Sequence, residues 1–233
     1  MTANPSLERT FTGKALGPMK LFYLTSSAFA LAAIALHRIK ISRFAELNDP
    51  FELLAVSLAE PDHRKAFRSL KEELNKSKGL LCFSASWSNP VLWGHYADKH
   101  AGIALGFEAT EGLPVQAIYS EHPLQIPIDK ATGKLVLEEP LVGELLRTKF
   151  VDWKYENEWR VFVNLDHSTK EGGMYFYDFS PDLRLSEVIL GPRCELPMSR
   201  VRSIVSKLHP KAVVRKSRIA FQSFHVVEDK SAN

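Results

Sequence analysis

The sequence predicts an α+β protein with a mixed, mainly antiparallel β-sheet core and flanking helices. Short apolar runs bounded by Gly, Pro, Asn and Ser recur along the 233 residues, as they do in strands. Stretches with helical spacing are fewer, and they do not alternate regularly with the strands as in a doubly wound fold. This mixed order, in which strands outnumber helices, favours the α+β class.

A single α+β domain is expected over residues 19–228. A chain of this length, 45% hydrophobic and 24% charged, has enough apolar material for one core. Residues 1–18 contain two prolines and two glycines, which predicts a flexible N-terminal arm. Residues 229–233 are expected to form a flexible tail.

Composition favours a soluble cytoplasmic protein. The net charge of +3 permits a nucleic-acid partner without requiring one. The two cysteines, Cys82 and Cys194, lie far apart, which argues against a disulfide framework and suits a reducing compartment. Cys82 lies in an apolar run and is expected to be a buried structural thiol. The apolar stretch 28–36 is too short to span a bilayer, so no membrane partner is expected.

Strands are predicted where apolar or alternating residues lie between turn residues. The turns Asn48-Asp49-Pro50 and Ser88-Asn89-Pro90 separate several of them, because Asn and Asp bond the local backbone and Pro fixes φ. In chain order, the predicted strands are 20–25, 39–42, 80–84, 103–107, 115–119, 153–163, 174–179 and 186–190, with one or two closing strands in 212–227.

Helices are predicted where apolar positions recur with helical spacing. Ser26 or Ser27 can cap the first helix, because a serine oxygen accepts from the free N–H groups of the first turn. Gly79 is expected to end the second helix and Gly102 the third. The predicted helices are 26–37, 61–77, 91–100, 135–150 and 197–208.

The segment 153–163 carries the densest chemistry. Its sequence, Trp-Lys-Tyr-Glu-Asn-Glu-Trp-Arg-Val-Phe-Val, alternates aromatic or polar with charged residues before an apolar run. In a strand, this period of two places four charged side chains on one face: Lys154, Glu156, Glu158 and Arg160. Such a face is either an exposed salt-bridged ladder or the floor of a cleft, and the difference decides whether the protein is an enzyme.

Several common chemistries lack their sequence signature. His95 and His100 form the only close histidine pair, but their spacing is wrong for one helix face and no cysteine pair accompanies them, so no metal site is expected. The chain has no Gly-x-Ser-x-Gly nucleophile elbow, phosphate loop or Gly-x-Gly-x-x-Gly fingerprint.

Three places remain unusual: Tyr23 in the first strand, the cluster Trp93-Gly94-His95-Tyr96 and Glu158. Each also has a purely structural interpretation. The tyrosines can be core residues with bonded hydroxyls. The two glutamates can be paired with Lys154 and Arg160.

Five ordered motifs resemble the bacterial family catalogued as domain of unknown function 2971. The resemblance covers about residues 20–225 and implies no established activity. Its motifs are Leu21-Phe22-Tyr23-Leu24-Thr25, Asn48-Asp49-Pro50-Phe51-Glu52, Cys82-Phe83-Ser84, the run from Trp93 to Gly102 and the run from Trp153 to Arg160.

The order of these motifs also resembles the catalytic core of ADP-ribosyltransferases, in the diphtheria-toxin and poly(ADP-ribose) polymerase branch. That fold is built on a split β-sheet and carries a His, a Tyr and a Glu on separate elements. Tyr23 stands where the branch has its His, Tyr96 resembles its Tyr, and Glu158, rather than Glu156, resembles its Glu. Leu24 stands in place of a small residue.

The resemblance implies that NAD is the substrate and that no metal is needed. Glu158 would bond a ribose hydroxyl and stabilise the oxocarbenium-like transition state. Tyr96 would stack on nicotinamide, Tyr23 would bond the adenosine ribose, and Arg160 or Lys154 would pair with the pyrophosphate or hold Glu158. Ser84 and His95 complete the expected NAD-binding set.

The expected function is therefore an NAD-using ADP-ribosyltransferase-like enzyme, a toxin or phage-defence effector that modifies a protein or nucleic-acid acceptor and has an antitoxin or operon partner. One alternative is a nucleic-acid-binding module of a defence system, catalysing nothing or a different reaction. A basic segment of the chain suggests this alternative. A solvated helix face is the simpler interpretation of that segment, because few aromatic residues interleave with its charges. A small structural or regulatory partner in a defence operon is the other alternative. The segment comprises Arg200, Arg202, Lys207, Lys211, Arg215, Lys216 and Arg218.

Overall fold

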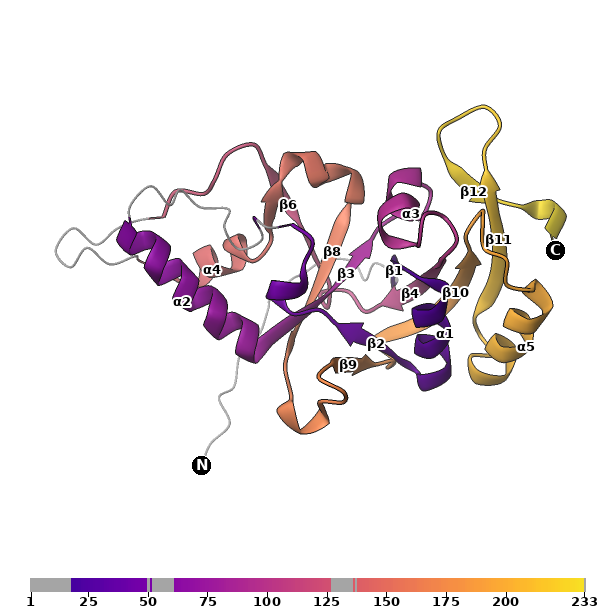
Figure 1. Ribbon diagram of the computed structural model, residues 1–233, viewed down its shortest axis with the longest axis horizontal. Helices are drawn as coiled ribbons and strands as arrows, with labels where there is room; N and C mark the ends of the chain where they lie inside the picture. The colour runs from indigo at the N-terminus through magenta and orange to yellow at the C-terminus, as the bar shows by residue number, and fades with distance from the viewer. Residues whose placement is uncertain (1–17, 50, 52–60, 127–135, 137, 233) are drawn as a thin grey trace.

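The computed structural model describes residues 18–49, 51, 61–126, 136 and 138–232. These residues form an α+β fold around a curled, mostly antiparallel sheet, which confirms the predicted class (Figure 1). In the described part of the chain the main sheet has eight strands, in the order β12-β11-β10-β4-β1-β3-β8-β5. Their bounds are β1 Met19–Thr25, β3 Lys78–Ser84, β4 Ile103–Ala109, β5 Val115–Gln116, β8 Glu158–Asn164, β10 Leu183–Leu190, β11 Val213–Ile219 and β12 Val226–Glu228.

Two small sheets and several helices surround the main sheet. The first small sheet pairs β2 (Arg38–Ile41) with β9 (Tyr175–Asp178), and the second pairs β6 (Ile118–Ser120) with β7 (Thr148–Phe150). The α-helices are α1 Ser27–Leu36, α2 Pro61–Ser77, α3 Pro90–Tyr96, α4 Glu139–Leu145 and α5 Met198–Leu208. The 3-10 helices are η1 Phe44–Glu46, η2 Val151–Glu156, η3 His167–Thr169 and η4 Lys230–Ala232.

The main sheet opens between β1 and β3. Strand β1 pairs with β4 along its whole length, from Met19 opposite Ala109 to Thr25 opposite Ile103. With β3 it pairs at one position only, Phe22 opposite Ser84. The strands from β12 to β1 are therefore joined to β3, β8 and β5 by a narrow seam, and the space beside this seam holds the candidate site.

The first helix and the first strand follow their local sequence signals. Ser26 caps α1, and its side-chain oxygen accepts a hydrogen bond from the Phe29 N–H at 3.3 Å. The helix ends at Leu36, and the following residue, His37, has a φ of 54° and donates its N–H to the Ala33 carbonyl. Buried residues of α1, among them Ile34, pack in the same core as Leu21 and Leu105 of the sheet.

The prediction of one strand over 153–163 is wrong in its first half. Residues 151–156 form the 3-10 helix η2, and β8 begins only at Glu158. Asn157 separates the two, with a φ of 44° that turns the chain through the left-handed region. Lys154 and Glu156 are therefore not on a strand face with Glu158, although Glu158 and Arg160 do share one face of β8.

Two helix boundaries and the role of Gly79 differ from the prediction. The helix expected over 135–150 is confined to α4, and its last residues form β7. The helix expected over 91–100 ends at Tyr96, because positive φ angles at residues 98–100 are incompatible with a right-handed helix. The second helix ends at Ser77 as predicted, but Gly79 is not its stop: it lies in β3, where an added Cβ would collide with the Ile41 side chain.

The two ends of the chain and the region 115–119 were also predicted from the sequence. The expected arm 1–18 lies outside the described residues except for its last residue. The expected tail contains the 3-10 helix η4, and the strand predicted over 115–119 is divided between β5 and β6. None of the helices in the described part of the chain has the length and apolar character needed to cross a membrane.

Candidate functional site

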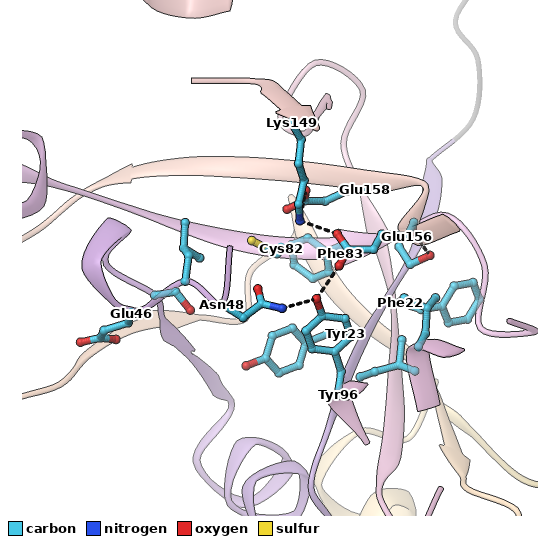
Figure 2. A pocket seen from close by; sticks show the side chains of 15 residues that line it. Phe22, Tyr23, Glu46, Asn48, Cys82, Phe83, Tyr96, Lys149, Glu156 and Glu158 are labelled. Atoms are coloured by element: carbon cyan, nitrogen blue, oxygen red, sulfur yellow. Dashed lines mark hydrogen bonds and ion pairs between the residues drawn. The ribbon is translucent and has the colours of Figure 1, made fainter. Parts of the chain in front are cut away.

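A pocket of about 260 Å³ lies where the sheet opens between β1 and β3 (Figure 2). Residues from five parts of the fold surround it: β1, β3, the segment around η1, α3 and the stretch from β7 to the start of β8. Its lining is Phe22, Tyr23, Leu24, Ser42, Glu46, Leu47, Asn48, Cys82, Phe83, Ser84, Leu92, Tyr96, Lys149, Glu156 and Glu158. The pocket thus combines apolar and aromatic walls with a few convergent charged groups, as small-molecule sites do.

Four buried charged residues form a cluster on one side of this pocket, and three of them, Lys149, Glu156 and Glu158, line it. Lys149 Nζ lies 2.5 Å from Glu156 Oε2 and 3.3 Å from Glu158 Oε2, and Arg160 Nη2 lies 2.9 Å from the same Glu158 oxygen. All four side chains are at most 6% exposed. Two carboxylates and two cations give this cluster a formal charge of zero, which is what allows it to be buried.

The two cations keep Glu158 ionised. Burial alone raises the pKa of a carboxyl group, but Arg160 and Lys149 outweigh it and hold the pKa of Glu158 below its usual range. Burial lowers the pKa of Lys149, and the two carboxylates reverse this, so that its pKa is raised. The cluster therefore holds a fixed carboxylate and a fixed ammonium across the neutral pH range.

Both cations bind the same oxygen of Glu158, the Cys82 thiol also bonds this carboxylate, and the Glu158 backbone is held as well. Lys149 and Arg160 both bind Oε2, so within the described residues these two ion pairs leave Oε1 without a cation. The Glu158 backbone N–H donates to the Tyr119 hydroxyl at 2.8 Å. Tyr119 and Lys149 are partners in the parallel pair of β6 and β7, so this small sheet holds both the backbone and the carboxylate of Glu158.

Glu156, by contrast, uses both carboxylate oxygens within the protein. Oε2 accepts from Lys149, and Oε1 accepts from the Tyr96 hydroxyl. The Tyr96 hydroxyl in turn accepts from Asn48 Nδ2 at 2.8 Å, and Figure 2 shows the resulting chain from Asn48 through Tyr96 and Glu156 to Lys149. Burial and the adjacent Glu156 raise the pKa of Tyr96, so this hydroxyl keeps its proton and remains a donor.

Tyr23 and Cys82 line the pocket from neighbouring strands. Tyr23 packs edge-to-face on Phe83, with ring centroids 6.1 Å apart, and burial raises its pKa to about 12. Cys82 lies opposite Arg160 in the pairing of β3 with β8. Burial and the nearby Glu158 raise the pKa of the Cys82 thiol, which disfavours the nucleophilic thiolate.

The structure therefore brings Tyr23, Ser84, Tyr96 and Glu158 to one pocket. The Ser84 hydroxyl donates to the Glu156 carbonyl at 2.6 Å and so fixes the chain that enters β8. Arg160 does not line this pocket: it is fully buried behind Glu158 and donates to the Leu146 carbonyl at 2.7 Å.

His95, the remaining residue predicted to bind NAD, lies outside the pocket lining. Its exposed ring meets the Tyr155 hydroxyl, with Nδ1 3.0 Å from that oxygen. Lys154, the other predicted pyrophosphate partner, is exposed on η2. Of the two roles predicted for Arg160, its position matches the one that holds Glu158 rather than pairing with a pyrophosphate.

Lys149 and Asn48 are the pocket residues that sequence reasoning missed. The sequence predicts Lys149 within the helix 135–150 and Asn48 within a turn. The turn signal was sound as far as the described residues show, because the Asp49 side chain accepts from the Phe51 N–H at 2.9 Å. A residue that the sequence assigns to a helix or a turn can also line a pocket, and only its tertiary contacts show this.

Comparisons with family models, curated proteins and solved structures find no match for this chain. Among the described residues, no group of three or more His, Cys, Asp or Glu side chains is placed to hold a metal ion. The site is therefore interpreted from its own geometry and chemistry.

Proposed function

We propose that this protein is an NAD-using ADP-ribosyltransferase-like enzyme and that the pocket between β1 and β3 receives the nicotinamide-ribose end of NAD. The observation that carries the proposal is the state of Glu158. It is a buried, ionised carboxylate with both cations on one oxygen, and it shares the pocket with Tyr23 and Tyr96. The split sheet and the sequence resemblance to ADP-ribosyltransferases support the same assignment.

The chemistry requires a fixed negative charge beside a sugar. When the bond between the nicotinamide nitrogen and ribose C1′ breaks, its electron pair goes to nicotinamide and positive charge develops on the ribose. A nucleophile of the acceptor then bonds to C1′ and loses its proton. A preorganised carboxylate in a pocket of low polarity stabilises the charged sugar more than the ground state, and this difference lowers the barrier.

The aromatic residues supply orientation. The Tyr96 ring is fixed through its hydroxyl by Glu156 and Asn48, so it offers a face of defined position for nicotinamide to stack on. Tyr23 contributes a protonated hydroxyl from β1 for a ribose oxygen. Arg160 and Lys149 act on the substrate only through the carboxylates that they hold.

The biological setting follows from the resemblance alone. A transferase of this kind acts as a toxin or a phage-defence effector in the cytoplasm, modifies a protein or nucleic-acid acceptor and is restrained by an antitoxin or another operon partner. These assignments form part of the proposal and are secondary to the chemistry of the pocket.

Product analysis tests the proposal. Purified protein is incubated with NAD that carries one label in nicotinamide and another in adenine, with cell extract supplied as a source of acceptors. The expected result is release of labelled nicotinamide, with the adenine label free as ADP-ribose or attached to a macromolecule. If NAD stays intact at high protein concentration in both the presence and the absence of extract, the proposal is wrong.

A further inference from the structure

The C-terminal part of the chain is rich in cations and lacks acidic residues over a long stretch. Between Glu195 and Glu228 the sequence has seven Lys or Arg residues and no Asp or Glu. This stretch builds α5, β11 and the connection to β12, which lie together at one end of the molecule (Figure 1). Such a surface attracts polyanions over a distance of about 8 Å at physiological ionic strength.

The structure separates the engaged cations of this stretch from the available ones. Arg215 is paired with Glu228 at 2.8 Å and lies 3.6 Å from Glu187. Lys216 Nζ donates to the carbonyls of Gly191 and Cys194. Three other cations are exposed to solvent, and these are Arg200, Lys207 and Lys211.

Two phenylalanines are presented at the tip of the hairpin between β11 and β12. Phe221 is 88% exposed and Phe224 is 95% exposed, whereas phenylalanine is normally buried. The connection stands out from the end of the molecule in Figure 1, and its base is closed by a hydrogen bond from the Ala220 N–H to the His225 carbonyl at 2.9 Å. The Arg218 guanidinium lies 4.5 Å from the Phe221 ring centroid, so a cation already occupies one position over this ring.

We propose that this end of the molecule binds single-stranded nucleic acid. Exposed aromatic rings stack on unpaired bases, and flanking cations bind the phosphates, which is the combination that single-strand-binding surfaces use. In this arrangement Phe221, Phe224 and Arg218 contact bases, and Arg200, Lys207 and Lys211 bind the backbone. A duplex hides the base faces from such rings, so unpaired strands are preferred.

The sequence context of the tip favours a wet interface over a lipid bilayer. Gln222 and Ser223 lie between the two rings, and insertion into hydrocarbon would bury their polar groups without partners. The base of the hairpin is also fixed to the body, because the Val226 N–H donates to the Ser88 carbonyl at 2.8 Å in the turn that precedes α3. This hydrogen bond joins the hairpin to the turn before α3, the helix that carries Tyr96. The proposed nucleic-acid binding does not depend on NAD chemistry.

Binding of short oligonucleotides tests this surface. Fluorescence anisotropy is measured with labelled single strands of DNA and RNA of about 12 nucleotides and with a duplex of the same length. The double variant Phe221→Ala/Phe224→Ala is compared with Phe29→Ala, which removes a phenylalanine that is 65% exposed on α1. Lys207→Glu/Lys211→Glu is compared with Lys65→Glu, which reverses an exposed charge on α2 at the other end of the molecule in Figure 1.

The expected result is single-strand binding that weakens as salt is raised from about 50 to about 200 mM and that exceeds binding to the duplex. The phenylalanine double variant lowers the affinity about tenfold or more, the lysine double variant lowers the affinity and its salt dependence, and both controls bind like the parent. The proposal is overturned if the parent does not bind at about 100 µM, if the phenylalanine and lysine double variants both bind like the parent, or if the protein binds anionic lipid vesicles and not oligonucleotides. Arms with DNA and RNA show which sugar is preferred.

Discussion

The Lys149 ammonium lies 3.3 Å from Oε2 of Glu158, the same oxygen that Arg160 binds, while its shorter contact of 2.5 Å is to Glu156. This buried lysine therefore couples the two carboxylates of the pocket. The two carboxylates differ, because Glu156 has both oxygens bound within the protein, whereas both cations that bind Glu158 among the described residues lie on its Oε2.

Replacing Lys149 by Met is expected to destabilise the fold by about 3–5 kcal/mol, because it leaves two buried carboxylates with a single cation. Lys149→Arg keeps the charge and is expected to cost less. The control is Lys154→Met, which removes an exposed lysine on η2 and is expected to change the free energy of unfolding by less than about 0.5 kcal/mol. Urea unfolding measures all three, and equal losses for Lys149→Met and Lys154→Met would contradict the cluster.

Glu158 is expected to contribute an acid-dependent part of the stability. Its folded pKa lies below the unfolded value of about 4.3, so the unfolded state binds more protons between these two pKa values. The contribution is complete above the unfolded pKa and is lost as the pH falls through the folded pKa. The free energy of unfolding, measured between about pH 7 and pH 3, should therefore decrease more steeply with falling pH for the parent than for Glu158→Gln. Parallel curves would show that the cations do not stabilise this carboxylate.

The hydroxyl of Tyr96 is expected to stabilise the fold, and its ring is expected to bind NAD. Tyr96→Phe removes the hydrogen bonds to Glu156 and Asn48 and should cost about 1–3 kcal/mol of stability, while the affinity for NAD changes little. Tyr96→Ala also removes the ring and should weaken NAD binding about tenfold or more. Isothermal titration measures the affinities. Tyr155→Phe, whose hydroxyl meets the exposed His95, is the control and should change neither quantity appreciably.

Gly102 is expected to be irreplaceable at the start of β4. A Cβ there would collide with the Thr25 carbonyl oxygen at the end of β1 and with the Ala97 backbone. Gly102→Ala should therefore lower the stability by about 1–3 kcal/mol through overpacking. Gly143→Ala, in α4 with open space at its Cβ position, should instead be neutral or stabilise by up to about 1 kcal/mol. Thermal unfolding measures the stability of both variants relative to the parent. The prediction is wrong if Gly102→Ala and Gly143→Ala lower the stability equally.

Local signals in the sequence predict the elements that local chemistry determines. The Ser26 cap, the apolar runs of β1 and β4 and the helical pattern of α2 are confirmed at nearly the expected positions. The turn at Asn157 was missed because alternation of residue types over a few positions does not exclude a short 3-10 helix that ends in a left-handed residue. The end of α4 was misplaced because apolar residues continue past Leu145, and the end of α3 was misplaced because the positive φ angles at residues 98–100 leave no pattern in the sequence.

The composition of the pocket depends on contacts between residues that are far apart in the sequence. The sequence resemblance singled out Tyr23, Tyr96 and Glu158, which the fold brings together. It could not identify Lys149, whose position depends on the parallel pairing of β6 with β7, nor the contact between Asn48 and Tyr96. The exposed phenylalanines at 221 and 224 were likewise invisible as a surface feature, because a sequence pattern does not show whether an aromatic residue is buried.

The rate of nicotinamide release by Glu158→Gln, measured beside NAD affinity, tests the central claim most directly. The amide keeps the size of the side chain but removes the charge that would stabilise the ribosyl cation. The expected result is a turnover rate lowered about 100-fold or more, with an affinity for NAD within a few-fold of the parent and a folded protein by circular dichroism. Glu156→Gln should retain much more activity than Glu158→Gln. Equal turnover by the parent and Glu158→Gln would contradict the account.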